Sequence, residues 1–204
     1  MNLLDAPLLF QILTAILSCI VFIKKRTFFL GLLSLFLVVT FVVELTGAYL
    51  SSIGGHNFLV YHLYLFFENT LIFLLYYKLI YDKKYLIISY FLLAVIFVLW
   101  CLIFFSQKYF RSTIIVGAFN VGMLVFLYLR ELLLSEKIIN YKKILPFWVS
   151  VGFLIFYLST IPFFSFWNYM RDRELFPILD FLIILMNLII SFGLIWSNKG
   201  EESY

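Results

Sequence analysis

Seven runs of about 20 mostly apolar residues occupy almost the whole chain of 204 residues. An α-helix of about 20 residues is long enough to cross the hydrocarbon core of a bilayer. The stretches between the runs are short, and none is long enough to fold as a separate soluble domain. We therefore predict one transmembrane domain over residues 1–204, an all-α bundle of seven helices. The expected spans are 4–23, 27–51, 58–80, 85–105, 112–134, 144–167 and 175–196.

The composition supports lipid as the solvent of these helices. Hydrophobic residues make up 65% of the chain and charged residues 13%, against about 45–50% and about 25% in soluble domains. A core of this size could not bury so much apolar surface away from water. The basic residues behind the net charge of +4 fall in short clusters between the apolar runs. Such clusters form no stripe for phosphates, so no nucleic-acid partner is indicated.

The Lys and Arg residues predict the orientation of the bundle. Cytoplasmic loops of membrane proteins carry an excess of these residues. One side collects eleven: Lys24, Lys25, Arg26, Lys78, Lys83, Lys84, Arg130, Lys137, Lys142, Lys143 and Lys199. The other side collects four: Lys108, Arg111, Arg171 and Arg173. We expect the N-terminus outside and the C-terminus in the cytoplasm. The first run has no basic residues before it and is interpreted as a retained helix rather than a signal peptide.

No pattern in the chain indicates catalysis or a bound metal. Cys19 and Cys101 both lie inside apolar runs, which is typical of small buried residues and provides neither a disulfide framework nor a metal pair. The two histidines, His56 and His62, are not four residues apart, and no H-E-x-x-H motif is present. No G-x-S-x-G motif occurs either. The sequence therefore predicts no catalytic residue, no metal and no cofactor.

Two carboxylates inside the apolar runs are the most informative residues. A charged residue at the centre of a span costs about 2.5–3.5 kcal/mol, so it usually faces a partner or a cavity. Glu68 lies near the middle of the third run, and Glu44 lies in the outer third of the second run. A carboxylate is an expensive way to make a packing contact that Ser or Asn could make.

Helical geometry groups the other polar residues with these two. At about 100° per residue, Tyr61 and Tyr64 share a face with Glu68, whereas His62 and Asn69 share an adjacent face. Most of these residues lie between the midplane and the outer end of their runs, which predicts a polar cavity that opens outward. The candidate binding residues are Glu44, Glu68, His62, Asn69, Asn120, Asp180 and Asn187.

Interhelical hydrogen bonding is the simpler interpretation of such polar stripes. It contributes about 0.6 kcal/mol per bond on average. We prefer this interpretation for five residues of the first, fifth and seventh runs. They are Gln11, Thr14, Ser18, Thr113 and Ser191. For Glu44 and Glu68, packing and function are both kept open.

A short internal similarity relates residues 67–80 to residues 119–132, at an offset of 52. FENTLIFLLYYKLI and FNVGMLVFLYLREL share a Phe, the polar residue after it, a Tyr and a final cation. Duplication is one explanation, and parallel repeats occur in some transporters. The other explanation is that helices entering the cytoplasm commonly end in a Tyr and a cation at the interface.

Three stretches carry a resemblance to known proteins: VVELTGAYL (42–50), YHLYLFFENTLIFLLYYK (61–78) and FWVSVGFLIFYLSTIPFF (147–164). They resemble small uncharacterised bacterial seven-helix membrane proteins. Some of those proteins resemble free-standing versions of the membrane sensor modules attached to signalling kinases. The resemblance implies a sensory or accessory role in the bacterial cytoplasmic (inner) membrane and assigns no catalytic residue.

Four functional hypotheses follow. The leading one is a non-enzymatic membrane module that binds a small ligand or a partner membrane protein through the outward polar cavity. The second is a small transporter or channel in which Glu68 and Glu44 titrate. The third is a membrane effector, for example in bacterial defence, that acts by oligomerisation. The last is an intramembrane hydrolase. The sequence alone leaves the oligomeric state open.

Overall fold

The computed structural model describes residues 6–135, 141–166 and 176–197. It contains seven α-helices, each long and apolar enough to span a membrane, which confirms the predicted fold class. They are α1 (Ala6–Lys25), α2 (Phe28–Ser52), α3 (Phe58–Tyr77), α4 (Lys83–Phe105), α5 (Tyr109–Leu134), α6 (Leu145–Ser165) and α7 (Phe176–Trp196). Each predicted span overlaps one helix. Within the described ranges the chain forms no strands, as expected where lipid cannot satisfy exposed backbone groups.

Local sequence signals set several of the helix boundaries. The Thr27 hydroxyl accepts a hydrogen bond from the Leu30 amide before α2 (3.4 Å), and the Asp82 carboxylate accepts one from the Lys84 amide before α4 (2.9 Å). Such side chains satisfy amides that have no partner inside the helix. Pro146 occupies the first turn of α6, where its missing N–H costs nothing.

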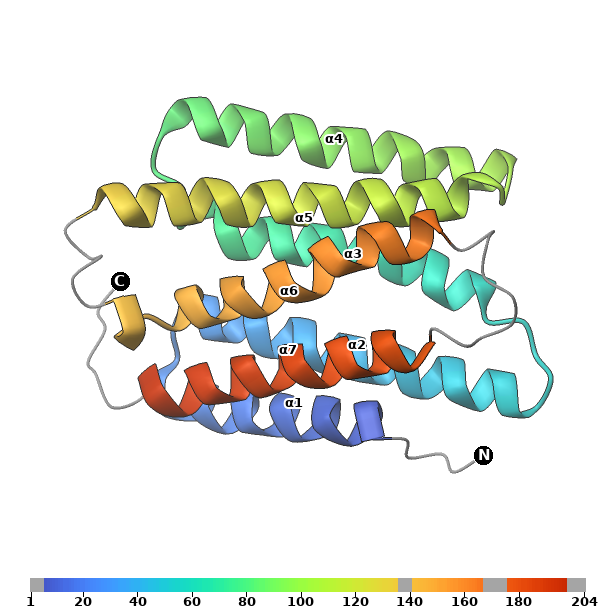
Figure 1. The fold of residues 1–204 in the computed structure, drawn as a ribbon, viewed down its shortest axis with the longest axis horizontal. Helices are drawn as coiled ribbons and strands as arrows, with labels where there is room; N and C mark the ends of the chain where they lie inside the picture. Colours follow the sequence, from blue (N-terminus) through green and yellow to red (C-terminus); the bar gives the residue numbers. More distant parts are fainter. Residues whose placement is uncertain (1–5, 136–140, 167–175, 198–204) are drawn as a thin grey trace.

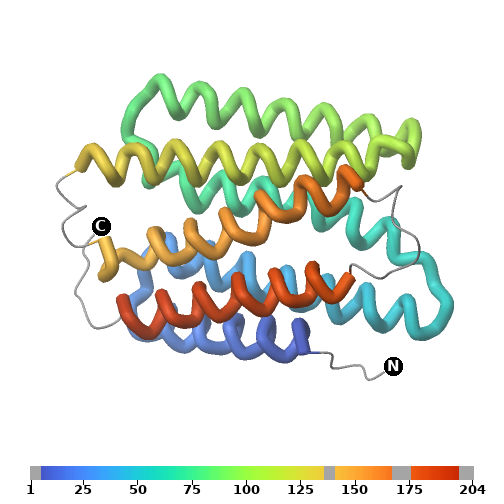
Figure 2. Tube along the Cα trace, viewed as in Figure 1, coloured from blue at the N-terminus to red at the C-terminus, as the bar shows by residue number. Residues whose placement is uncertain are grey.

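Six of the helices form a closed ring, and the seventh lies outside it (Figures 1 and 2). Around the ring the neighbours are α1, α2, α3, α5, α6 and α7, and α7 then packs against α1. Helix α4 packs only against α3 and α5 among the major contacts. It is also the helix with the fewest buried residues: Ser89, Ile96 and Ile103. Most of the buried residues therefore belong to the six helices of the ring.

The contacts around the ring have a two-fold pattern. Exchanging α1, α2 and α3 with α5, α6 and α7 leaves the set of ring neighbours unchanged. Consecutive helices run in opposite directions, so α3 and α5 are parallel where they meet, and so are α7 and α1 (Figure 1). This pattern relates α3 to α7, whereas the sequence similarity of residues 67–80 and 119–132 relates α3 to α5. The contact pattern therefore leaves both explanations of that sequence similarity open.

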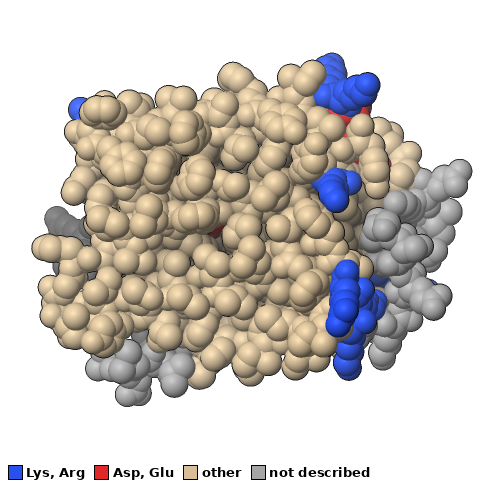
Figure 3. Space-filling model, turned by 180° about the vertical axis from the view of Figure 1, so that it is seen from behind, with Lys and Arg blue, Asp and Glu red and all other residues tan. Residues whose placement is uncertain are grey.

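Basic residues gather at one end of the bundle, which we call the basic end (Figure 3). This end holds the α1–α2, α3–α4 and α5–α6 connections. Its described cations are Lys24, Lys25, Arg26, Lys78, Lys83, Lys84, Arg130, Lys142 and Lys143. The opposite end has Lys108 and Arg111. Lys137, Lys199, Arg171 and Arg173 lie outside the described residues. The structure thus separates these cations between the two ends as the sequence analysis assumed. The orientation of the bundle in the membrane stays a prediction.

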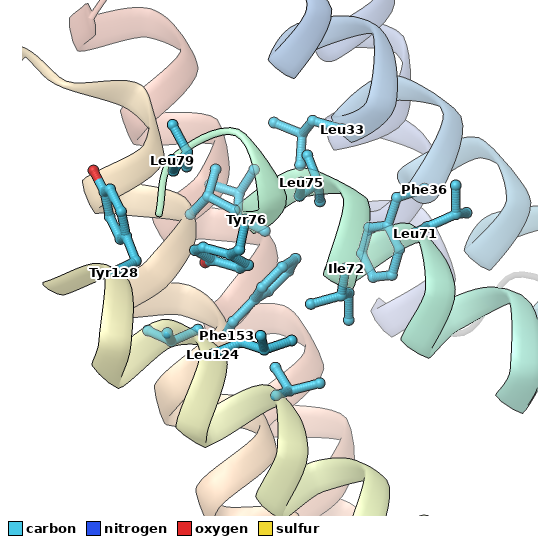
Figure 4. Packing of buried hydrophobic residues seen from close by; sticks show 14 of the residues in the cluster. Leu33, Phe36, Leu71, Ile72, Leu75, Tyr76, Leu79, Leu124, Tyr128 and Phe153 are labelled. Carbon is cyan, nitrogen blue, oxygen red and sulfur yellow. The ribbon is translucent and has the colours of Figure 1, made fainter. Parts of the chain in front are cut away.

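Large apolar side chains fill the ring toward the basic end (Figure 4). We call this cluster the apolar plug and define it by six residues from α2, α3 and α6. They are Leu33, Phe36, Ile72, Leu75, Tyr76 and Phe153, each no more than 2% exposed. The Phe36 and Phe153 rings meet edge to face with centroids 5.4 Å apart. The Tyr76 hydroxyl is paired with the Ser150 hydroxyl at 2.8 Å. The plug closes the ring in this half.

Candidate functional site

The two glutamates lie directly beyond the apolar plug, on the side away from the basic end. Along α2 the plug residue Phe36 is followed one turn later by Thr40 and another turn later by Glu44. Helix α3 runs the opposite way, so Tyr61, Tyr64 and Glu68 come before Ile72. Antiparallel packing of α2 on α3 therefore brings the polar stretches of both helices to the same depth.

Glu68 is held by a hydrogen bond from across the ring. The Tyr157 hydroxyl of α6 donates to Glu68 Oε1 at 2.6 Å. That length is typical of a hydroxyl that donates to a carboxylate. The Tyr64 hydroxyl lies 3.5 Å from the same oxygen. Helices α3 and α6 are not neighbours in the ring, so this bond crosses its interior.

The Tyr64 hydroxyl has one proton for two acceptors. It lies 2.8 Å from the Thr40 hydroxyl oxygen, and Thr40 donates its own proton to the Phe36 carbonyl at 2.8 Å. Tyr64 therefore donates mainly to Thr40, because the longer contact to Glu68 is weaker. Tyr157 is the stronger donor to Glu68.

Glu44 has its own tyrosine partner. The Tyr61 hydroxyl donates to Glu44 Oε2 at 3.1 Å. Gly47, one turn after Glu44, makes room for this ring: a Cβ built there would lie 2.8 Å from Tyr61 Cζ and would collide with the hydroxyl. A glycine is therefore required where Tyr61 crosses α2.

We define the acidic site as Thr40, Glu44, Tyr61, Tyr64, Glu68 and Tyr157. All but Tyr157 are partly exposed, in contrast to the plug. Glu44 and Glu68 interact electrostatically with each other, and Glu44 also interacts with Asp180 of α7. Figure 3 shows an acidic area recessed among uncharged side chains near the middle of one face.

Each glutamate keeps one oxygen unbonded. The hydrogen bonds of Glu68 both end on Oε1, and that of Glu44 ends on Oε2. Within the described residues, neither Glu68 Oε2 nor Glu44 Oε1 has a hydrogen-bond partner, and no Lys or Arg pairs with either carboxylate. Two neighbouring carboxylates that repel each other, with no Lys or Arg beside them, attract a positively charged ligand.

His62 does not join this site. Its ring is 3% exposed and packs between α3 and α4, against Trp100 and Phe104. His62 Nε2 lies 3.3 Å from the Trp100 carbonyl oxygen, and the Trp100 indole N–H donates to the His62 carbonyl at 2.9 Å. This reciprocal pair fastens α4 to the ring. His62 and Glu68 share a helix but face different neighbours.

Asn69 also lies apart from the glutamates, at the contact of the parallel helices α3 and α5, and Asn120 is buried on α5 about one turn after Gly117. Asn69 donates to the Leu65 carbonyl of its own helix at 3.0 Å. A Cβ built at Gly117 of α5 would lie 3.1 Å from the Asn69 amide nitrogen, so the two helices approach closely here. Asn69 Oδ1 and both amide atoms of Asn120 are buried without a hydrogen-bond partner in the described part of the chain.

Asn187 occupies the other contact of parallel helices, between α7 and α1. Its amide donates to the Ile183 carbonyl at 2.8 Å, and its Oδ1 is buried with no partner among the described residues. Beside it, the Thr14 hydroxyl pairs with that of Ser191 at 2.9 Å. This pair fits the packing interpretation. In contrast, Ser18 and Thr113 donate to carbonyls of their own helices, and Gln11 Oε1 has no hydrogen-bond partner in the part of the chain that the structure describes.

Tyr157 is the site residue that the sequence reasoning missed. Its signal was its depth: it lies in the interior of α6, whereas tyrosines of spanning helices favour the two interfaces. A Tyr this deep needs a partner for its hydroxyl. The identity of that partner depends on the ring arrangement, which the sequence does not display.

The candidate residues are divided between the acidic site and the helix contacts. No group of three or more His, Cys, Asp and Glu residues close enough to hold a metal ion occurs among the described residues. Glu44 and Glu68 lie together in the acidic site, and Asp180 interacts electrostatically with Glu44. His62, Asn69 and Asn187 each lie at a helix contact, and Asn120 is buried on α5. In comparisons with known proteins, no family model, no curated protein and no solved structure matched this chain.

Proposed function

We propose that this integral membrane protein is a ligand-binding module of the sensory or accessory kind, whose ligand is a small cation held at the acidic site. In this proposal the acidic site opens to the outside, and the basic end lies in the cytoplasm. The observation that carries the proposal is the pair of unbonded carboxylate oxygens, Glu44 Oε1 and Glu68 Oε2.

The energetics support a functional reading of these carboxylates. An acidic residue within a span costs about 2.5–3.5 kcal/mol, and an interhelical hydrogen bond returns only about 0.6 kcal/mol on average. The bonds from Tyr61 and Tyr157 therefore do not offset the cost of two glutamates. A bound cation would offset it, because opposite charges at low dielectric attract strongly.

The tyrosines also suit a cation. Their hydroxyl protons are directed toward Glu44, Thr40 and Glu68, which leaves hydroxyl lone pairs for a metal cation. Their ring faces would favour an alkylammonium ion instead. Both kinds of cation are therefore used in the test.

The test measures cation binding to the protein in nanodiscs. Potassium, sodium and tetramethylammonium chlorides are titrated at constant ionic strength, and the unfolding temperature is followed. We expect a saturable rise with at least one cation, because a ligand that binds the folded state stabilises it. Glu68→Gln and Glu44→Gln keep the side-chain size, remove the charge and should each weaken binding at least tenfold.

Glu131→Gln is the matched control. The Glu131 carboxylate lies at the basic end and accepts hydrogen bonds from the backbone amides of Tyr81 and Asp82, at 2.8 and 2.9 Å. We expect its cation affinity to equal that of the unchanged protein. The proposal fails if no cation gives a saturable rise, or if Glu68→Gln and Glu44→Gln bind as tightly as Glu131→Gln.

A second candidate function is cation or proton transport, and the two-fold ring favours it. Two equivalent three-helix units around one site can rock against each other, as in transporters built from parallel repeats. The polar, sparsely bonded contacts at Asn69 and Asn187 lie where the two units meet.

Flux separates the two functions. Liposomes containing the protein are given a pH gradient, and internal pH and cation uptake are followed. Transport predicts a flux that Glu68→Gln abolishes and Glu131→Gln retains. Saturable binding without flux would assign the protein to the ligand-binding module.

A further inference from the structure

A pocket at the basic end of the bundle has no role in the proposed function of the acidic site. It is a pocket of about 470 Å³ enclosed by the ends of α1, α2, α3, α6 and α7. Three cations from separate segments line it: Lys25 at the end of α1, Arg26 in the α1–α2 turn and Lys78 after α3. No Asp or Glu is among its described lining residues.

We propose that this pocket binds the phosphate-containing headgroup of an anionic phospholipid. Its walls carry apolar side chains beside the cations, including Val21, Leu75 and Leu145. This combination fits an amphiphile with a negative head better than a soluble anion. Pockets of basic residues between spanning helices are suited to such headgroups, and the volume is in the range of small-molecule sites.

The charges of the helix ends do not cancel the cations. Helix C-termini carry about −0.5 charge and N-termini about +0.5. The C-terminal ends of α1, α3 and α7 and the N-terminal ends of α2 and α6 meet at the pocket. They contribute about −1.5 and about +1, against three full positive charges. The sum is about +2.5, so the pocket retains a strong preference for an anion.

The cations are also incompletely used by the protein itself. Lys25 Nζ makes one hydrogen bond, to the Ser197 carbonyl at 3.4 Å, and Lys78 Nζ lies 4.0 Å from the centroid of the Phe28 ring. Arg26 is exposed, and its side chain makes no hydrogen bond within the described residues. Its guanidinium offers five donors in a planar fork that matches phosphate.

The backbone at Arg26 supports this role. Arg26 has φ of 49°, and its amide donates to the Phe22 carbonyl at 2.8 Å to close α1. Glycine is the usual residue in this left-handed position at a helix end. An arginine there adopts a backbone conformation that is unfavourable for residues other than glycine. Residues in unfavourable conformations of this kind cluster at ligand-binding sites. The use of arginine in place of glycine is explained if its guanidinium is needed at the pocket.

The test uses the purified protein in detergent, titrated with phosphatidylglycerol, with phosphatidylcholine and with inorganic phosphate. Bound lipid is counted by native mass spectrometry. We expect one phosphatidylglycerol to bind at least tenfold more tightly than phosphatidylcholine. The triple variant Lys25→Gln, Arg26→Gln and Lys78→Gln should lose this preference. The control triple variant Lys83→Gln, Lys84→Gln and Lys143→Gln removes the same charge from the same end and should retain it.

Arg26→Gly separates binding from folding. Glycine accepts the left-handed backbone, so the unfolding temperature should stay the same or rise, while phosphatidylglycerol affinity falls several-fold. If both triple variants lost the preference for phosphatidylglycerol equally, the preference would come from general attraction between the basic end and anionic lipid, and the proposal would be overturned. Equal binding of the two lipids to the unchanged protein would also overturn it. Tight binding of inorganic phosphate without lipid preference would overturn the lipid assignment and leave a site for a soluble anion.

Discussion

The apolar plug and the acidic site occupy the same ring of helices at different depths, and they are built on opposite principles. In the plug, six large side chains are at most 2% exposed and make one polar contact, from Tyr76 to Ser150. In the acidic site, two carboxylates and three tyrosines share a few hydrogen bonds and leave carboxylate oxygens unbonded. The ring is thus sealed toward the basic end and polar beyond the seal.

This difference indicates that close packing and the proposed cation binding are separated along the bundle axis. The plug supplies close packing between α2, α3 and α6, which is the main source of helix association in lipid. The acidic site supplies charge at a depth where charge is expensive. Substitutions in the two regions should therefore have different signatures.

The largest stability effect is expected from Phe153→Ala. Phe153 is fully buried and contacts the rings of Phe36, Tyr76 and Tyr157. Removing it leaves a cavity and should cost about 3–5 kcal/mol of unfolding free energy. Phe126→Ala removes a side chain that is 60% exposed and should cost less than about 1 kcal/mol. Equal losses, measured by denaturant titration in micelles, would show that the plug does not hold the ring together.

Gly47→Ala should have the next largest effect. The added methyl group collides with Tyr61, so we expect a loss of about 1–3 kcal/mol together with weaker cation binding. Gly122→Ala is the control, since a Cβ there meets the tip of the Leu158 side chain at 3.1 Å, and that tip can turn aside. Unchanged binding in Gly47→Ala would show that Tyr61 does not position Glu44.

Tyr157→Phe should have a small effect on stability and a clear effect on binding. It removes the hydroxyl that donates to Glu68 at 2.6 Å and keeps the ring. We expect a loss of less than about 1 kcal/mol, the scale of hydrogen bonds between spanning helices. Cation affinity should fall several-fold because Glu68 loses its orientation. A loss of several kcal/mol with unchanged binding would place Tyr157 with the plug.

The smallest effect is expected from Asn187→Leu. Asn187 Oδ1 is buried without a partner among the described residues, so an apolar side chain of similar size removes an unsatisfied group. Such replacements are close to neutral or stabilising, and we expect a change within about 0.5 kcal/mol. Cation binding should be unaffected. Reduced binding in this variant would extend the site across the ring to the contact of α7 and α1.

Sequence reasoning predicted the helices well because lipid imposes length and composition on every span. It placed Tyr64 on the face of Glu68, as the structure has it, because both residues lie on one helix. It placed Tyr61 with Glu68 as well, whereas the structure pairs Tyr61 with Glu44 of the preceding helix. It did not find Tyr157, and it counted His62 among the candidate binding residues, because the partners of both residues depend on which helices are neighbours. His62 packs against α4, which lies outside the ring, so its separation from the acidic site follows from the position of that helix.

Cysteine accessibility in intact membrane vesicles tests whether a cation site lies above a sealed plug. Cys19 and Cys101 are first replaced with Ala, and the variants Thr40→Cys and Ile72→Cys are then compared. A cationic and an anionic methanethiosulfonate reagent of similar size are applied from each side. We predict that Thr40→Cys reacts from the side opposite the basic end, several-fold faster with the cationic reagent, while Ile72→Cys does not react. Equal rates with the two reagents, or equal protection of both positions, would contradict a cation site above a sealed plug.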